Sequence, residues 1–194
     1  MNKIITLISA SGLFLIGGFS MFSYFLNIDK SGPRIVNIES PITIAGVSMR
    51  TSMKTIMRDA GTLGKTYKSV KDRNIVKHKV EPWGFAAVSR NFSSGGDSWD
   101  YIMGDVVAST KDQPEELTIY TIPTGTYAVF RIAPRAKFLW GPAIGLTKKY
   151  VYTEWIHASE YALNPEEIGD FEFHDKRSAS DKPMIELFVS VKKK

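Results

Sequence analysis

Two segments near the carboxyl end of the chain alternate between apolar and polar residues with the period of a β-strand. In residues 185–191 every odd-numbered residue is aliphatic, and the other face carries Glu186 and Phe188. In residues 171–174 the two phenylalanines share one face, whereas Glu172 and the histidine share the reverse. Each strand therefore places a glutamate among apolar residues, and we expect adjacent strands to bring the two acids together.

Apolar residues spaced by three and four predict two amphipathic helices. The first covers residues 53–74, where Gly61 and Gly64 favour a bend or a frayed turn. The second carries on one face Ile144, Thr147, Val151, Trp155 and Ala158. Strand patterns fill most of the remaining chain: residues 34–48 with a break near Pro41, a hairpin of 83–92 and 98–109, then 117–132, 171–175 and 184–191.

The order strand, helix, hairpin occurs twice, which predicts a duplicated α+β domain. Its antiparallel strands would form one sheet with two helices on one side. The wholly apolar strand faces suit the helices. We therefore expect the faces that bear Glu172, His174, Glu186 and Phe188 to form a ligand cleft on the other side of the sheet.

The beginning of the chain predicts a membrane anchor. Residues 4–28 are 25 consecutive uncharged residues, which at about 1.5 Å per residue span a hydrocarbon core of about 30 Å. A cleaved signal peptide and a buried core helix are the alternatives, but the run ends in bulky residues and not at a small-residue cleavage site. We expect a single-pass anchor at residues 1–29, a linker at 30–34 and a domain at 35–194, with the domain outside the cytoplasm because the short head is positively charged.

Charge and composition argue against several other functions. The net charge is +5 and the basic residues are scattered, so no nucleic-acid surface is predicted. The three lysines at the end of the chain form a cluster, which we interpret as a solvated tail. There is no cysteine, and the three histidines lack the spacing of metal ligands. Phosphate-binding loops and nucleophile elbows are also absent from the sequence, so we expect no metal and no cofactor.

Three stretches, residues 41–52, 117–130 and 152–189, resemble the GyrI-like, or AraC-type effector-binding, domain in their order and spacing. The resemblance covers roughly residues 35–193 and implies a duplicated fold with a small-molecule pocket between its halves. It also implies that acids at the positions of Glu172 and Glu186 line the pocket, and that the ring of Phe188 packs on ligands. Regulators of this family carry a separate helix-turn-helix region, for which this chain leaves no room, so direct transcription control is not expected.

A carboxylate among aromatic rings favours an organic cation or a cationic amphiphile as the ligand. His174 departs from the resembled family, where an apolar residue or tyrosine is usual, and its protonation would weaken a preference for cations. The candidate ligand-binding residues are Glu172, Glu186, Phe188, His174, Trp83 and Tyr127.

Alternatives to the binding module follow from the same residues. Glu172 and Glu186 also suit ordinary cross-strand ion pairs on an exposed sheet, with Arg90, Arg131 or Lys192 as partners. Some members of the resembled family hydrolyse reactive small molecules. That activity would make Glu172, with a raised pKa, the proton-transfer group beside Tyr127. The family's namesake inhibits DNA gyrase, so a protein-interaction role is a third hypothesis, and no particular protein partner is predicted.

Overall fold

A computed structural model of the chain describes residues 28–164 and 168–194. The predicted anchor at residues 4–28 lies, except for its last residue, outside this part. Among the described residues, no helix combines the length and the apolar character needed to cross a membrane.

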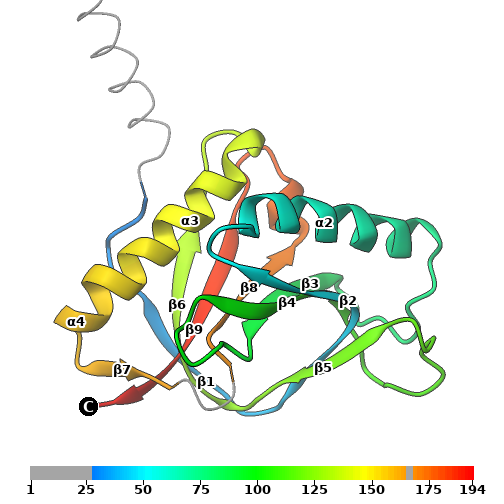
Figure 1. Cartoon of the computed structure of the whole chain (residues 1–194), viewed down its shortest axis with the longest axis horizontal. Coiled ribbons are helices and arrows are strands. Elements are labelled where there is room, and N and C mark those ends of the chain that lie inside the picture. The colour runs from blue at the N-terminus through cyan, green and yellow to red at the C-terminus, as the bar shows by residue number, and fades with distance from the viewer. Residues whose placement is uncertain (1–27, 165–167) are drawn as a thin grey trace, which may run out of the picture.

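The described strands form an antiparallel sheet with the helices on one side, as predicted (Figure 1). The strands are β1 Arg34–Ile38, β2 Ile42–Ser52, β3 Gly84–Arg90, β4 Ser98–Val106, β5 Thr118–Ile122, β6 Gly125–Ile132, β7 Tyr161–Leu163, β8 Asp170–Asp175 and β9 Ile185–Lys193. Their order is β1-β6-β9-β8-β3-β4-β2-β5, and β7 pairs with β9. The order is symmetric about the β8–β3 pair, which confirms two strand, helix, hairpin units.

The helices cover the two halves of one sheet face. Helix α2, Ile56–Asp72, buries Leu63, Tyr67 and Val70 against the first half. Helix α3, Trp140–Tyr150, continues through a π-helical segment, η2 Val151–Trp155, into α4 Ile156–Ala158, and packs on β6 and β9 of the second half. The bend expected near Gly61 and Gly64 is wrong, since α2 continues through both glycines.

The opposite face of the sheet is buried without a helix over it. One core there joins residues of β2, β3, β4, β5, β6 and β8 with partly buried residues of β1 and β9. Strands β1 and β2 pair with β6 and β5 in nearly continuous register, Ile38 opposite Gly125 and Ile42 opposite Ile122. The predicted strand 117–132 is divided at Pro123, as 34–48 is at Pro41, because proline cannot donate to the ladder. The ribbon formed by β1 and β2 paired with β6 and β5 encloses this core.

The register of β8 and β9 separates the two glutamates. Glu172 lies opposite Leu187, and Glu186 lies opposite Phe173. Residues paired across an antiparallel ladder point to the same face, so Glu172 points to the helices and Glu186 to the opposite side. The expectation that both acids share one face was wrong, because alternation within each strand does not fix the register between strands.

Close backbone approach between β2 and β4 requires glycine at position 46. A Cβ placed on Gly46 would lie 1.9 Å from the Met103 carbonyl oxygen, whereas a Cβ on Gly61 of α2 would meet nothing within 4 Å. Gly46→Ala should lower the free energy of unfolding by about 3 kcal/mol through overpacking. The control Gly61→Ala should raise it by about 0.5 to 1 kcal/mol through helix propensity. Urea unfolding of the full chain in a nonionic detergent measures both, and a harmless Gly46→Ala would contradict the register of β2 and β4.

Candidate functional site

Lys148 of α3 lies between two carboxylates of β8. Its Nζ is 2.8 Å from Asp170 Oδ1 and 2.8 Å from Glu172 Oε1. Both carboxylate side chains are 3% exposed and the lysine side chain is 22% exposed, so the contact is largely shielded from water. Asp170 and Glu172 are two residues apart in a strand and therefore share the helix-facing side. We call these three residues the Lys148 cluster.

Two tyrosines donate hydrogen bonds to the Lys148 cluster. The Tyr152 hydroxyl donates to Asp170 Oδ2 at 2.6 Å. The Tyr101 hydroxyl donates to Glu172 Oε2 at 3.4 Å, which is long for this kind of bond. Tyr152 belongs to η2 of the second half, whereas Tyr101 belongs to β4 of the first half. The cluster therefore connects the two halves of the domain on the side of the helices.

The neighbouring charges reverse the effect of burial on Glu172. Burial alone raises the pKa of this carboxyl, but Lys148 and His174 outweigh burial and lower the pKa to about 2. Burial likewise lowers the pKa of the Lys148 ammonium, and the two carboxylates bring it well above its usual value. The hydrolase hypothesis expected a raised pKa for Glu172, and this expectation is wrong, because the charges of Lys148 and His174 lower it.

Aromatic side chains extend from this cluster along the sheet. The ring of Phe85 stacks on His174 with centroids 4.3 Å apart, and Trp83 lies 5.6 Å from Phe85. The ring centroid of Trp140 of α3 lies 6.2 Å from that of His174. All four side chains are partly exposed. We call Trp83, Phe85, His174 and Trp140 the aromatic strip.

A third buried carboxylate, Asp105, adjoins the aromatic strip. Pairing of β4, β3 and β8 places Asp105, Phe85 and His174 in one row across the sheet. Asp105 Oδ1 accepts hydrogen bonds from the Tyr67 hydroxyl and, at 3.0 Å, from Trp83 Nε1. Its other oxygen, Oδ2, is buried and has no hydrogen-bond partner among the described residues. Burial and the bond to Asp105 raise the pKa of Tyr67.

The structure brings together half of the predicted ligand-binding residues. Glu172, His174 and Trp83 all belong to the helix-facing side, where they contact the cluster, the strip or Asp105. The other three point to the opposite face: Tyr127, Glu186 and Phe188.

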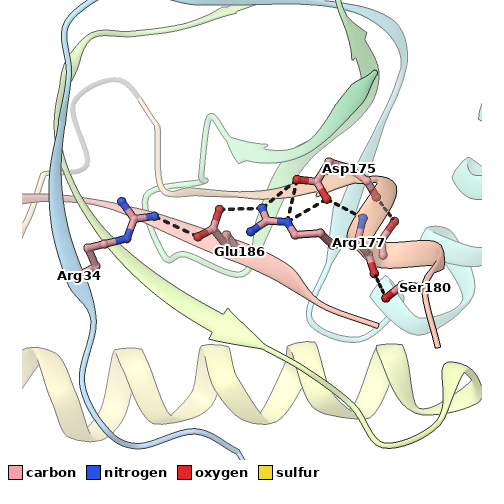
Figure 2. Close-up of polar contacts among 6 residues, drawn as sticks. Arg34, Asp175, Arg177, Ser180 and Glu186 are labelled. Carbon is pink, nitrogen blue, oxygen red and sulfur yellow. Dashed lines mark hydrogen bonds and ion pairs between the residues drawn. The ribbon is translucent and has the colours of Figure 1, made fainter. Parts of the chain in front are cut away.

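Glu186 belongs to an ionic network on that opposite face. It accepts hydrogen bonds from Arg34 at 2.9 Å and from Arg177 at 3.1 Å, and Arg177 also binds Asp175 (Figure 2). The network joins β1 and β9 to the 3₁₀ helix η3, Lys176–Ala179. Glu186 thus matches the ion-pair alternative, although with arginines other than those expected.

Tyr127 and Phe188 pack inside the core that the curled sheet encloses. Tyr127 is 1% exposed, and its hydroxyl donates to the Pro123 carbonyl oxygen at 2.9 Å. Phe188 stacks on Phe171 with centroids 4.5 Å apart, and Tyr127 contacts both rings edge-on. Packing accounts for both residues, as their apolar neighbours require.

A hollow of about 490 Å³ lies elsewhere, at the edge of the second half. It is lined by residues 28–30, residues 131–135, Ala143 and Thr147. None of the residues of the Lys148 cluster or of the aromatic strip lines it. Size alone therefore does not identify the hollow as the functional site.

Sequence reasoning missed five polar members of the site: Tyr101, Asp105, Lys148, Tyr152 and Asp170. Lys148 had a usable signal, because it follows Ile144 by four residues and precedes Val151 by three, which places a lysine on the apolar helix face. Asp105 lies in a predicted strand, but nothing in the sequence indicates which residues of the adjacent strands lie beside it.

The fold and the site define a class of effector-binding, small-molecule-binding domains. Residues 34–191 match the Cass2 family, which is described as integron-associated effector binding protein. The match covers most of the chain, so the chain belongs to this family. The resemblance to effector-binding domains in the sequence is thereby confirmed.

Solved structures share the fold. The integron cassette protein VCH_CASS2 of Vibrio cholerae has a TM-score of 0.59 at 16% identity, over 84% of this chain and 97% of that one. SAV2435, solved bound to tetraphenylphosphonium, has a TM-score of 0.60 at 16% identity, over 82% and 93%. The EcmrR C-terminal domain has a TM-score of 0.52 at 14% identity, over 83% and 97%. No curated protein matches the chain significantly.

Glu172 should make the free energy of unfolding depend on pH in the acid range. Its pKa is lower in the folded chain than its ordinary value of 4.5. Its contribution is therefore complete above about pH 4.5 and is lost as the pH falls towards about 2, in total about 3 kcal/mol. The difference in unfolding free energy between the wild type and Glu172→Gln should shrink by that amount from neutral pH to about pH 2.

Urea unfolding at a series of pH values measures this difference. Glu116→Gln is the control, because Glu116 forms an exposed ion pair with Arg73 that contributes little. A difference for Glu172→Gln that does not change with pH would contradict the buried pairing with Lys148.

Proposed function

We propose that this chain binds organic cations or cationic amphiphiles on the aromatic strip between α2 and α3. The observation that carries the proposal is the charge balance of the helix-facing side. Three buried carboxylates, Asp105, Asp170 and Glu172, lie there with one lysine, Lys148, in contact with two of them. Asp105 forms no ion pair among the described residues, although Lys71 Nζ lies over the neighbouring ring of Trp83, 3.9 Å from its centroid. A desolvated acid without an ion-pair partner favours a ligand that supplies positive charge.

The rings of the strip add a second attraction for the same class of ligand. A cation over an aromatic face gains about 0.5 to 2 kcal/mol, depending on how much water is removed. Phe85 and Trp140 are partly exposed and flank His174, whereas the ring of Trp83 already has Lys71 Nζ 3.9 Å from its centroid. The proposed site therefore contains three of the residues predicted from the sequence, Glu172, His174 and Trp83. Phe85 and Trp140 of the aromatic strip complete it.

Membership in an effector-binding family supports small-molecule binding by this chain. SAV2435, which shares the fold, was solved with tetraphenylphosphonium, a cation whose charge is surrounded by four aromatic rings. The aromatic strip offers rings and acids suited to such a molecule. Tetraphenylphosphonium is thus a suitable probe.

Replacing Phe85 tests the location of the site. Phe85→Leu should weaken tetraphenylphosphonium binding roughly threefold to tenfold, because the leucine lacks the ring face. Phe188→Leu is the matched control on the opposite face of the sheet, and its affinity should equal that of the wild type. Isothermal titration calorimetry of the full chain in a nonionic detergent measures both. Weaker binding by Phe188→Leu alone would place the ligand on the other face and contradict the proposal.

We also propose that residues 4–28 anchor the binding domain in a membrane and that the domain faces outward. The support is the uncharged run of 25 residues behind a short basic head. The full chain should stay in the membrane pellet after alkaline carbonate extraction, and protease added to intact spheroplasts should digest the domain. A chain released by carbonate would refute the anchor, and a protected domain would refute the orientation.

A further inference from the structure

Asp105 differs from the other buried acids of the described chain in lacking a cationic partner. Asp170 and Glu172 share Lys148, and Asp59 pairs with Arg58 at 3.0 Å. Asp105 is 1% exposed, and its two hydrogen-bond donors are the neutral groups of Tyr67 and Trp83. Both donors bind Oδ1, so Oδ2 remains buried without a donor.

An unpaired oxygen of this kind is costly to keep. Leaving a buried acceptor unsatisfied costs on the order of 1 to 3 kcal/mol, and more when the group is charged. A bound molecule that brings an N–H donor and a positive charge removes both penalties in one contact. Asp105 therefore has the properties expected of a ligand-binding group that is incomplete without its ligand.

Glu172 is less available for the same task. Its Oε1 is bound to Lys148, and its Oε2 faces Tyr101 and His174. A cationic ligand at Glu172 would share the carboxylate with the lysine ammonium, and this juxtaposition of two cations in a desolvated place is unfavourable. Lys148 of the chain itself already supplies the positive charge next to Glu172.

We propose that Asp105 is the residue that receives the charged group of the ligand, and that it selects aromatic cations carrying N–H donors, such as amidinium groups. This inference rests on the proposed function and specifies its ligand class. Phe85 lies next to Asp105 in the same row of the sheet, and His174 follows it, so an aromatic ligand body can lie on this row with its donor group at Asp105. Trp83, which is partly exposed, contacts the carboxylate, so Asp105 lies one side chain from solvent.

The test compares two variants of the same strand with a defined probe. Asp105→Asn should weaken binding of 4-phenylbenzamidinium to the full chain by about tenfold or more, because a charge-assisted hydrogen bond is lost. Asp100→Asn is the matched control: Asp100 lies in β4 on the opposite face, bound to Arg50. Its affinity for the probe should equal that of the wild type. Calorimetry in detergent and near-ultraviolet circular dichroism measure affinity and fold.

The outcomes separate the two proposals. Wild-type affinity in a folded Asp105→Asn protein, with weaker binding by Phe85→Leu, would overturn the role of Asp105 and leave the binding function in place. A wild-type chain that binds neither 4-phenylbenzamidinium nor tetraphenylphosphonium would overturn the binding function itself.

A second comparison needs no variant and applies even if Asp105→Asn does not fold. The wild-type chain should bind 4-phenylbenzamidinium about tenfold more tightly than its N,N,N′,N′-tetramethyl analogue, which keeps the charge and has no N–H. Equal affinities would show that no acceptor of the chain forms a hydrogen bond with the amidinium N–H groups, and would overturn the proposed selection of cations with N–H donors.

Discussion

The bridge from Lys148 to Asp170 and Glu172 is the contact on which the helix-facing side of the domain depends. It fixes α3 to β8, and through Tyr101 it reaches β4 of the other half. Removing one partner of a buried ion pair typically costs about 3 to 5 kcal/mol, because the remaining charge stays desolvated. The bridge therefore fixes the helix of the second half to its own strand, and it contacts the first half through the hydrogen bond from Tyr101.

The same bridge decides which acid is left for a ligand. An isolated buried glutamate would have a raised pKa and would attract any cation. Lys148 instead lowers the pKa of Glu172 and binds its carboxylate, whereas the buried oxygen without a hydrogen-bond partner among the described residues belongs to Asp105. The buried acid that has no cationic partner in the described chain therefore lies on β4 and not on β8. The two strands are about two strand spacings, or roughly 10 Å, apart across the sheet.

Periodicity alone predicted the elements well and their relative orientation poorly. Apolar spacing identified the helix at residues 53–74 and the repeated strand, helix, hairpin order, because both depend on local sequence. It could not decide whether Glu172 and Glu186 share a face, since this depends on a one-residue choice of register between β8 and β9. Nor could it find the partner of Glu172, which lies 24 residues away on a helix that packs above the strand.

On the opposite face, aromatic residues near an acid pack against one another. Tyr127 and Phe188 have the composition of a ligand pocket, yet they pack against Phe171 in a core enclosed by β1, β2, β5 and β6. Their neighbour Glu186 is satisfied by two arginines. On the helix-facing side, by contrast, partly exposed rings adjoin Asp105, a buried acid that forms no ion pair with any described residue.

A crystal structure of the chain with tetraphenylphosphonium tests the central claim most directly. Our account predicts the cation against Phe85 and His174, on the helix-facing side between α2 and α3. A cation bound instead in the hollow beside Lys30 and Arg131, or against Phe188 on the opposite face, would contradict it.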